Sequence, residues 1–179
     1  MMRSLANFVG FQLAWWACVL GAIHDAAWLG VLAGIAFVAL QWLASPQRRV
    51  DARLVACAVL LGLLLDGSLA QLGWIDYRGG TAHLPAPAWI VALWAAFAMT
   101  ITHSLGWLRP GMALLLGAIG GPLAYLGAER MGAVELTSGV QATIALAIGW
   151  ALATCALVLV ARHARGASPV RPLVAGGSR

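Results

Sequence analysis

The sequence predicts an all-α membrane protein, built as a bundle of six transmembrane helices. The prediction depends on three observations: 62% of the 179 residues are hydrophobic, only 9% are charged, and the mean hydropathy is +0.88. A soluble domain of this length needs more polar surface to stay in solution. A span takes roughly 20 apolar residues, so six spans would use about 120 residues and leave only short loops.

Six apolar stretches, separated by polar or turn-forming residues, are expected to form the spans. They cover residues 5–23, 28–44, 54–74, 88–108, 112–128 and 140–161. Residues 75–87, with two prolines and two adjacent glycines, form the longest expected interior loop. We therefore expect residues 1–165 to be one membrane domain, and residues 166–179, rich in Arg, Gly and Pro, to be a disordered cytoplasmic tail.

The arginines give an independent test of the span count. The net charge of +5 involves 11 arginines and no lysine, and the arginines stand singly or in small groups between apolar stretches. If the N-terminus is cytoplasmic, six spans place all of them inside except Arg78 and Arg130. Positive residues favour the cytoplasmic side, and five spans would put the arginine-rich C-terminus outside. The pattern predicts N-in/C-in orientation and does not indicate a nucleic-acid partner.

The residue types that bind metals or cofactors show no useful clustering. Cys18, Cys57 and Cys155 lie in three different apolar stretches and are interpreted as small hydrophobic residues. No two histidines have the spacing of metal ligands, and no nucleotide, haem or quinone motif is present. We expect neither a metal nor a cofactor. An ATP-driven transporter and a zinc protease are disfavoured.

Asp66 is the first candidate for a functional residue. It lies about two thirds of the way along the third apolar stretch. An ionised carboxylate at mid-bilayer costs roughly 2.5–3.5 kcal/mol, so it is expected to face the bundle interior, carry a proton, or pair with a cation such as Arg78 or Arg130. Asp66 is either a catalytic acid–base or a structural hydrogen-bonded group.

A second candidate is a polar face on the fourth stretch. Thr100, His103 and Ser104 are spaced three and four apart, which places them on one side of a helix. Gln12 and Asn7 of the first stretch are expected at similar depth, with Gln12 opposite the face. The cluster predicts either hydrogen bonds that hold helices together or the floor of a substrate site. His103 is the member that can exchange protons near neutral pH, so it is the second catalytic candidate.

The fifth stretch carries a candidate packing motif. Gly117 and Gly121 form a small-xxx-small ridge that permits close helix approach, and Pro122 follows directly. Close packing is the main interpretation, and an unwound substrate-binding segment is the alternative.

Several short segments together form a further pattern. They are Phe11-Gln12, Trp15-Trp16 and Cys18 to Ala22; then Pro87 to Trp89, Leu93-Trp94, Phe97-Ala98, Thr100, His103 to Leu105 and Trp107-Leu108; and finally Gly117-Ala118, Gly121 to Tyr125 and Gly132-Ala133. Their order resembles the bacterial integral-membrane family catalogued as domain of unknown function 2878, over nearly the whole chain except the tail. The resemblance implies a multi-pass protein of the bacterial inner membrane and no assigned chemistry. It also suggests an association with lipid-modifying enzymes.

Three classes of function remain open at this point. The first is an accessory or assembly component linked to membrane-lipid modification. The second is a membrane-embedded enzyme that acts on a lipid or other apolar substrate, with Asp66 or His103 as acid–base, and the third is a small oligomeric transporter. Expected partners are membrane lipid and another membrane protein or further copies of the chain. An enzyme is expected to have a lateral, lipid-facing opening, a transporter an aqueous mid-depth cavity, and an accessory protein neither.

Overall fold

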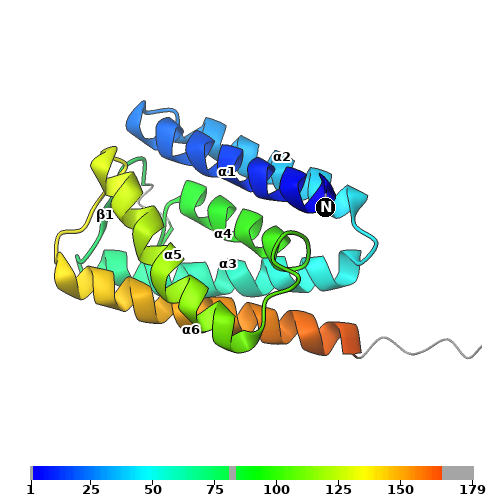
Figure 1. Cartoon of the computed structure of the whole chain (residues 1–179). Coiled ribbons are helices and arrows are strands. Elements are labelled where there is room, and N and C mark those ends of the chain that lie inside the picture. The colour runs from blue at the N-terminus through cyan, green and yellow to red at the C-terminus, as the bar shows by residue number, and fades with distance from the viewer. Residues whose placement is uncertain (1, 81–83, 167–179) are drawn as a thin grey trace, which may run out of the picture.

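The computed structural model describes residues 2–80 and 84–166, which form six α-helices and one short strand pair (Figure 1). The elements are α1 (Met2–Ile23), α2 (Ala27–Ala44), α3 (Arg48–Gln71), β1 (Asp76–Tyr77), α4 (Ala88–Ile101), α5 (Pro110–Arg130), β2 (Val134–Glu135) and α6 (Val140–Gly166). Except for Gly166, the expected tail lies outside the described residues.

Five of the six helices are long and apolar enough to cross a membrane, and α4 is the exception. At 14 residues, α4 is about 21 Å long, which is less than the roughly 30 Å of a hydrocarbon core. The apolar stretch 88–108 was expected to be one helix, and this expectation is wrong after Ile101. The Thr100 carbonyl accepts hydrogen bonds from the backbone N–H groups of His103 and Leu105, so the chain turns instead of continuing the helix.

The short helix α4 occupies the centre of the bundle. It packs against α1, α2, α3 and α6, and Figure 1 shows it enclosed by them. Most of its side chains are buried, including Trp89, Trp94 and Met99. The outer faces of the longer helices instead expose large apolar residues such as Leu60, Leu123 and Ile144. This arrangement suits a bundle surrounded by lipid, because hydrocarbon solvates exposed leucine and isoleucine.

Glycines allow the helices within two hairpins to approach closely. An added Cβ at Gly30 of α2 would lie 2.5 Å from the Cα atom of Cys18 in α1. On α5, a Cβ at Gly117 would lie 2.2 Å from the carbonyl oxygen of Trp150 in α6, and one at Gly121 would lie 2.3 Å from the Trp150 ring. The glycine ridge of α5 therefore faces α6.

The two loops at one end of the bundle meet in the strand pair. β1 and β2 are antiparallel, and Tyr77 is opposite Val134. The backbone N–H of Arg78 also donates to the carbonyl of Ala133 at 2.9 Å, which extends the contact by one residue. The pairing holds Tyr77 at the end of the bundle, with its side chain directed into the core.

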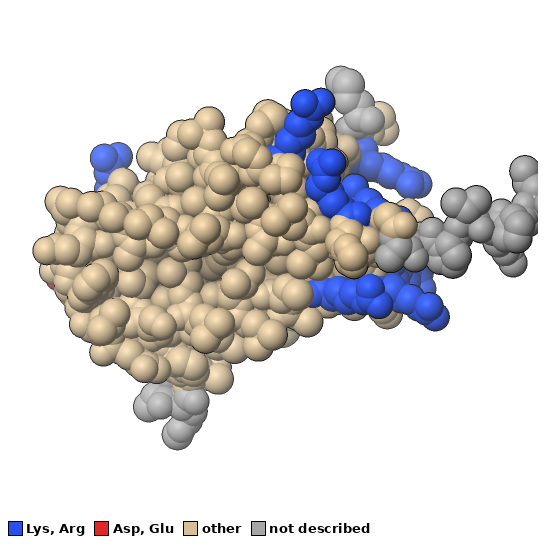
Figure 2. All heavy atoms as spheres, turned by 90° about the horizontal axis from the view of Figure 1, so that it is seen from below, with Lys and Arg blue, Asp and Glu red and all other residues tan. Residues whose placement is uncertain are grey.

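The arginines gather at the opposite end (Figure 2). In Figure 1 this end carries the N-terminus, the α2–α3 and α4–α5 connections and the end of α6. Its described arginines are Arg3, Arg48, Arg49, Arg53, Arg109, Arg162 and Arg165. Arg78 and Arg130 lie at the other end, beside the strand pair. The arginines, which are unevenly distributed between the expected loops, are therefore also unevenly distributed between the two ends of the folded bundle.

Candidate functional site

Asp66 lies at the centre of a buried hydrogen-bond network. Its side chain is completely buried within α3 and accepts three hydrogen bonds. The Tyr77 hydroxyl donates to Oδ1 at 2.7 Å, the Trp94 indole N–H donates to Oδ2 at 2.6 Å, and the Tyr125 hydroxyl also donates to Oδ1. Burial raises the pKa of Tyr77, which keeps this hydroxyl protonated as a donor. The Asp66 hydrogen bonds come from these three donors, not from the arginines considered in the sequence.

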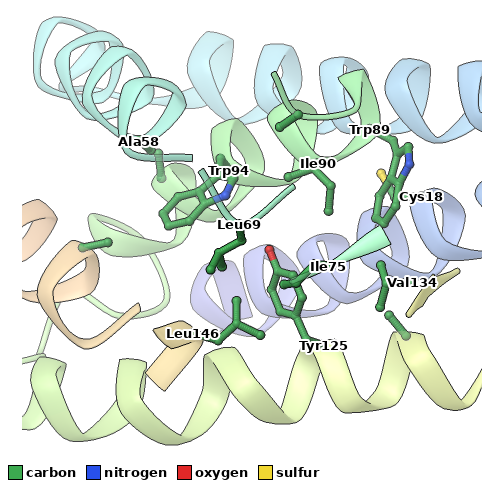
Figure 3. Close-up of a cluster of buried hydrophobic side chains, with 14 of the residues drawn as sticks. Cys18, Ala58, Leu69, Ile75, Trp89, Ile90, Trp94, Tyr125, Val134 and Leu146 are labelled. Carbon is green, nitrogen blue, oxygen red and sulfur yellow. The ribbon is translucent and has the colours of Figure 1, made fainter. Parts of the chain in front are cut away.

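Two of these donors also belong to a group of packed aromatic rings. The Trp94 ring stacks on Trp150 of α6, with centroids 4.2 Å apart, and Phe97 and Tyr125 contact Trp150 edge-on. Figure 3 shows the Tyr125 ring reaching into the cluster of buried side chains that also contains Trp94. Asp66 therefore fixes the orientation of two aromatic side chains through their polar atoms.

These aromatic rings form one wall of a pocket of about 360 Å³. The pocket lies between α1, α4, α5 and α6, and most of its lining is apolar. It is lined by Phe8, Phe11, Gln12, Trp15, Ile90, Leu93, Trp94, Phe97, Thr100, Ser104, Leu105, Leu116, Gly117, Gly120, Gly121, Ala124, Tyr125, Trp150 and Thr154. Asp66 is not among them, so its connection with the pocket runs through Trp94 and Tyr125.

The pocket reaches the side of the bundle between α1 and α5. Phe8 of α1 is 51% exposed and Leu116 of α5 is 41% exposed, and both line the pocket. Gly120 is another exposed lining residue, and an added Cβ there would meet no atom within 4 Å. The rim therefore consists of apolar residues on faces that would contact lipid.

The polar cluster predicted on the fourth stretch is divided between two places. Gln12, Thr100 and Ser104 line the pocket. Ser104 donates to Asn7 Oδ1 at 2.7 Å, and the Asn7 amide donates to the Met99 carbonyl at 3.3 Å. Asn7, rather than Gln12, therefore makes the hydrogen-bonded contact between α1 and the α4 region. The turn after Ile101 removes His103 from the common helical face.

His103 belongs to a second polar cluster at the arginine-rich end. Its Nδ1 lies 3.0 Å from the Thr102 hydroxyl, which donates to Asp51 Oδ1 at 2.6 Å. Asp51 is completely buried, and its Oδ2 has no hydrogen-bond partner among the described residues. Arg165 of α6 donates to the Thr102 carbonyl at 3.2 Å. Asp51 precedes the expected third span, which starts at residue 54, but lies within α3 because the helix begins at Arg48.

No metal centre is apparent in the described part of the chain. Its His, Cys, Asp and Glu side chains form no group of three that could hold a metal ion. Cys18 is buried, and its thiol donates to the Gly30 carbonyl at 3.3 Å, whereas Cys57 and Cys155 are half-buried. The pocket has room for an organic ligand, and its wall offers aromatic surface and a few hydroxyl and amide groups.

Comparison with known proteins identifies a family but no characterised relative. Neither the curated proteins nor the solved structures include a match to this chain. A family model described as protein of unknown function (DUF2878) matches residues 4–156, which contain the pocket, the Asp66 network and most of α6. The match covers far more than half of the sequence, and the chain therefore belongs to this family.

Proposed function

We propose that the protein binds the hydrocarbon chain of a membrane lipid in the pocket between α1, α4, α5 and α6. The observation that supports this is an apolar pocket with a rim of exposed apolar residues on the side of the bundle. Its volume of about 360 Å³ falls in the range of small-molecule sites, roughly 300–1,000 Å³. A chain could enter from the bilayer between Phe8 and Leu116 without crossing a polar barrier.

The character of the wall favours this function over transport of a polar solute. A polar pathway needs groups that replace hydration, whereas the lining here is dominated by aromatic and aliphatic side chains. Several of the polar groups in the wall are already engaged. Thr100 donates to the Phe97 carbonyl at 2.7 Å, and Ser104 donates to Asn7.

We further propose six spans with both termini cytoplasmic, in the inner membrane of a bacterium. The gathering of arginines at the end that holds the N-terminus and the end of α6 supports this orientation. In this arrangement α4 completes the set of six spans. It is shorter than the other five, which shield it from lipid. The pocket then opens toward the hydrocarbon region.

Blocking the rim tests the binding function. Gly120→Leu places a large side chain at the mouth, where an added Cβ meets nothing, so the helix packing is preserved. Gly111→Leu is the matched control, because Gly111 is also an exposed α5 glycine with free space but does not line the pocket. The readout is crosslinking to a photoactivatable hexadecyl ester in membranes, followed by mapping of the labelled peptides.

We expect wild-type protein and Gly111→Leu to label on α1 and α5 at the rim. Gly120→Leu should reduce this labelling about tenfold, which corresponds to a loss of about 1.4 kcal/mol of binding free energy. Labelling spread evenly over all exposed helix faces, and unchanged by Gly120→Leu, would show that the pocket does not hold the chain.

A second candidate function is acid–base chemistry on the bound lipid. The observation that favours it is that Tyr125 lines the pocket and donates to the buried Asp66, so a proton could pass between a bound molecule and the carboxyl group. Without such chemistry, the protein would hold the chain for a partner enzyme that modifies lipids. His103 does not line the pocket, so a role for it would require another site.

Lipid analysis of Tyr125→Phe separates direct chemistry from presentation to a partner. Phe keeps the ring that packs against Trp150 but removes the hydroxyl. If Tyr125 transfers protons, lipid mass spectrometry of cells with this variant should match that of a deletion strain, although photo-labelling of the pocket persists. A lipid profile that differs between deletion and wild type, but not between Tyr125→Phe and wild type, would instead support presentation.

A further inference from the structure

Two polar atoms in the pocket wall have no partner. The Trp150 indole Nε1 and the Thr154 hydroxyl oxygen are buried and form no hydrogen bond of normal geometry among the described residues, and the Tyr125 hydroxyl lies near the indole. Both residues line the pocket, and Thr154 is completely buried. Buried polar atoms are normally hydrogen-bonded, so these two atoms are available to a molecule that binds in the pocket.

The two atoms are well placed to act together. They are four residues apart on α6, which puts them on the same face of the helix, one turn apart. The Trp150 ring is held by its stacking on Trp94, with an interplanar angle of 16°. Gly117 of α5 packs directly against this face, since a Cβ there would lie 2.8 Å from the Thr154 hydroxyl oxygen and 2.2 Å from the Trp150 carbonyl oxygen.

The chemistry of the wall defines what this molecule offers. An indole N–H can only donate, so its partner must be an acceptor, and a hydroxyl can donate to the same kind of atom. Within the described chain the pocket is lined by no Asp, Glu, Lys, Arg or His. A carboxylate or phosphate at this position would lack a counter-charge in a low-dielectric environment.

We infer that the pocket recognises a neutral long-chain molecule through an acceptor oxygen of the alcohol or ester type, bound by Trp150 and Thr154. This inference depends on the proposed binding of a lipid chain and specifies its chemical class. The hydrocarbon chain of this molecule lies against the aromatic wall of the pocket. Its oxygen lies beside α6, away from the rim at Phe8 and Leu116. Selectivity between lipids then comes from these two donors rather than from the apolar wall, which accepts any hydrocarbon.

Competition experiments on the full chain in lipid nanodiscs test the inference. The probe is a photoactivatable hexadecyl ester, and the competitors are hexadecane, hexadecanol, hexadecyl acetate and palmitate. The acetate and the alcohol should halve labelling at a concentration about tenfold lower than hexadecane, a difference of about 1.4 kcal/mol. Palmitate, which carries a carboxylate, should compete no better than hexadecane.

Variants of α6 identify the donor. Thr154→Val keeps the shape of the side chain but removes the hydroxyl. The concentration of hexadecyl acetate that halves labelling should rise severalfold, which lowers the advantage of the acetate, while that of hexadecane should stay unchanged. Thr154→Ser retains the hydroxyl and should keep the advantage. Thr143→Val is the matched control, because the Thr143 hydroxyl is on the same helix but donates to the Gly139 carbonyl at 2.9 Å.

Each result has a separate meaning. Absence of rim labelling in wild-type protein would overturn the proposed function. Labelling that hexadecane blocks as well as hexadecyl acetate would leave the binding of a chain intact but overturn the inference. Strongest competition by palmitate would overturn the assignment of a neutral ligand, and an unchanged acetate advantage in Thr154→Val would remove Thr154 from the site.

Discussion

A single carboxyl group joins three parts of the bundle. Asp66 of α3 accepts hydrogen bonds from Tyr77 in β1, Trp94 in α4 and Tyr125 in α5. Without these donors, burying the carboxyl group would be unfavourable in a low-dielectric interior. These hydrogen bonds also give each donor an acceptor. The network therefore stabilises the position of the β1 loop and the packing of two pocket residues.

Substitution of Asp66 should reveal how much the network contributes. Asp66→Leu leaves three buried donors without an acceptor, at about 1–3 kcal/mol each, and should abolish a folded protein in detergent. Asp66→Asn should fold with a smaller loss, because the amide oxygen can accept from Trp94 and its N–H groups can donate to the two tyrosine hydroxyls. The measurement is the thermal unfolding midpoint by tryptophan fluorescence. An Asp66→Leu midpoint equal to wild type would contradict a structural role for the network.

The sequence predicts the importance of Asp66 but not its partners. A carboxyl group inside an apolar stretch is recognisable from local sequence, because the cost of its burial is a property of that residue. Its donors are 11, 28 and 59 positions away, and tyrosine and tryptophan in apolar stretches are equally expected as packing residues. The pocket depends on the same long-range contacts, so Trp150 and Thr154 could not be distinguished from ordinary core residues.

The α5–α6 hairpin shows how two glycines and one large side chain determine an interface. Gly117 and Gly121 provide the space that the Trp150 backbone and ring occupy. This close approach places the Trp150 ring against Trp94, and so builds one wall of the pocket. The small-residue ridge was readable from its spacing, but the residue that fills it was not, because spacing on one helix does not identify the opposing helix.

The three α5 glycines near this interface should respond differently to alanine. In Gly117→Ala or Gly121→Ala, the new methyl group would lie within 2.3 Å of Trp150 atoms, so the helices must separate. Such overpacking typically lowers the free energy of unfolding by about 1–3 kcal/mol, and we expect a loss of this size for either substitution. Gly120→Ala meets no atom and should be neutral or slightly stabilising, because alanine favours a helix over glycine. Folded yield and thermal midpoint in detergent provide the comparison, and equal effects at all three positions would contradict this packing.

Hydrogen bonds made by side chains accompany the early end of α4, which the hydropathy pattern does not predict. Residues 88–108 are apolar enough to suggest one span, yet the helix ends at Ile101. Thr102 donates to Asp51, and the Trp107 indole donates to the Ser104 carbonyl, so side chains satisfy polar groups in the turns. Serine and threonine compete in this way with helical hydrogen bonds. The position of the end therefore depends on partners in α3, which hydropathy alone does not report.

The bundle as a whole combines a short central helix with five longer helices around it (Figure 1). Irregular backbone is tolerated at membrane depth where protein covers it. The segments that flank α4 contain both buried residues, Ala86 and Leu108, and exposed ones such as Leu84 and Trp107. Turns that the protein partly covers thus lengthen the path of the α4 segment beyond its 14 helical residues.

Cysteine labelling tests whether the chain crosses the membrane at α4. The background has Cys18, Cys57 and Cys155 replaced by alanine, and each variant carries one cysteine. Exposed positions at the strand-pair end are Asp76 and Glu135, and Gly111 and His163 lie at the arginine-rich end. None of these substitutions removes an arginine, so the charges that set orientation are retained.

A membrane-impermeant maleimide should label Asp76→Cys and Glu135→Cys in intact spheroplasts. Gly111→Cys and His163→Cys should react only after permeabilisation, because the arginine-rich end is expected to face the cytoplasm. Asp76 and Gly111 lie on either side of α4, so opposite accessibility of this pair means that the α4 segment crosses the bilayer. If Gly111→Cys reacted in intact spheroplasts, α4 would return to the side it started from. The bundle would then have five crossings, with the arginines of α6 outside.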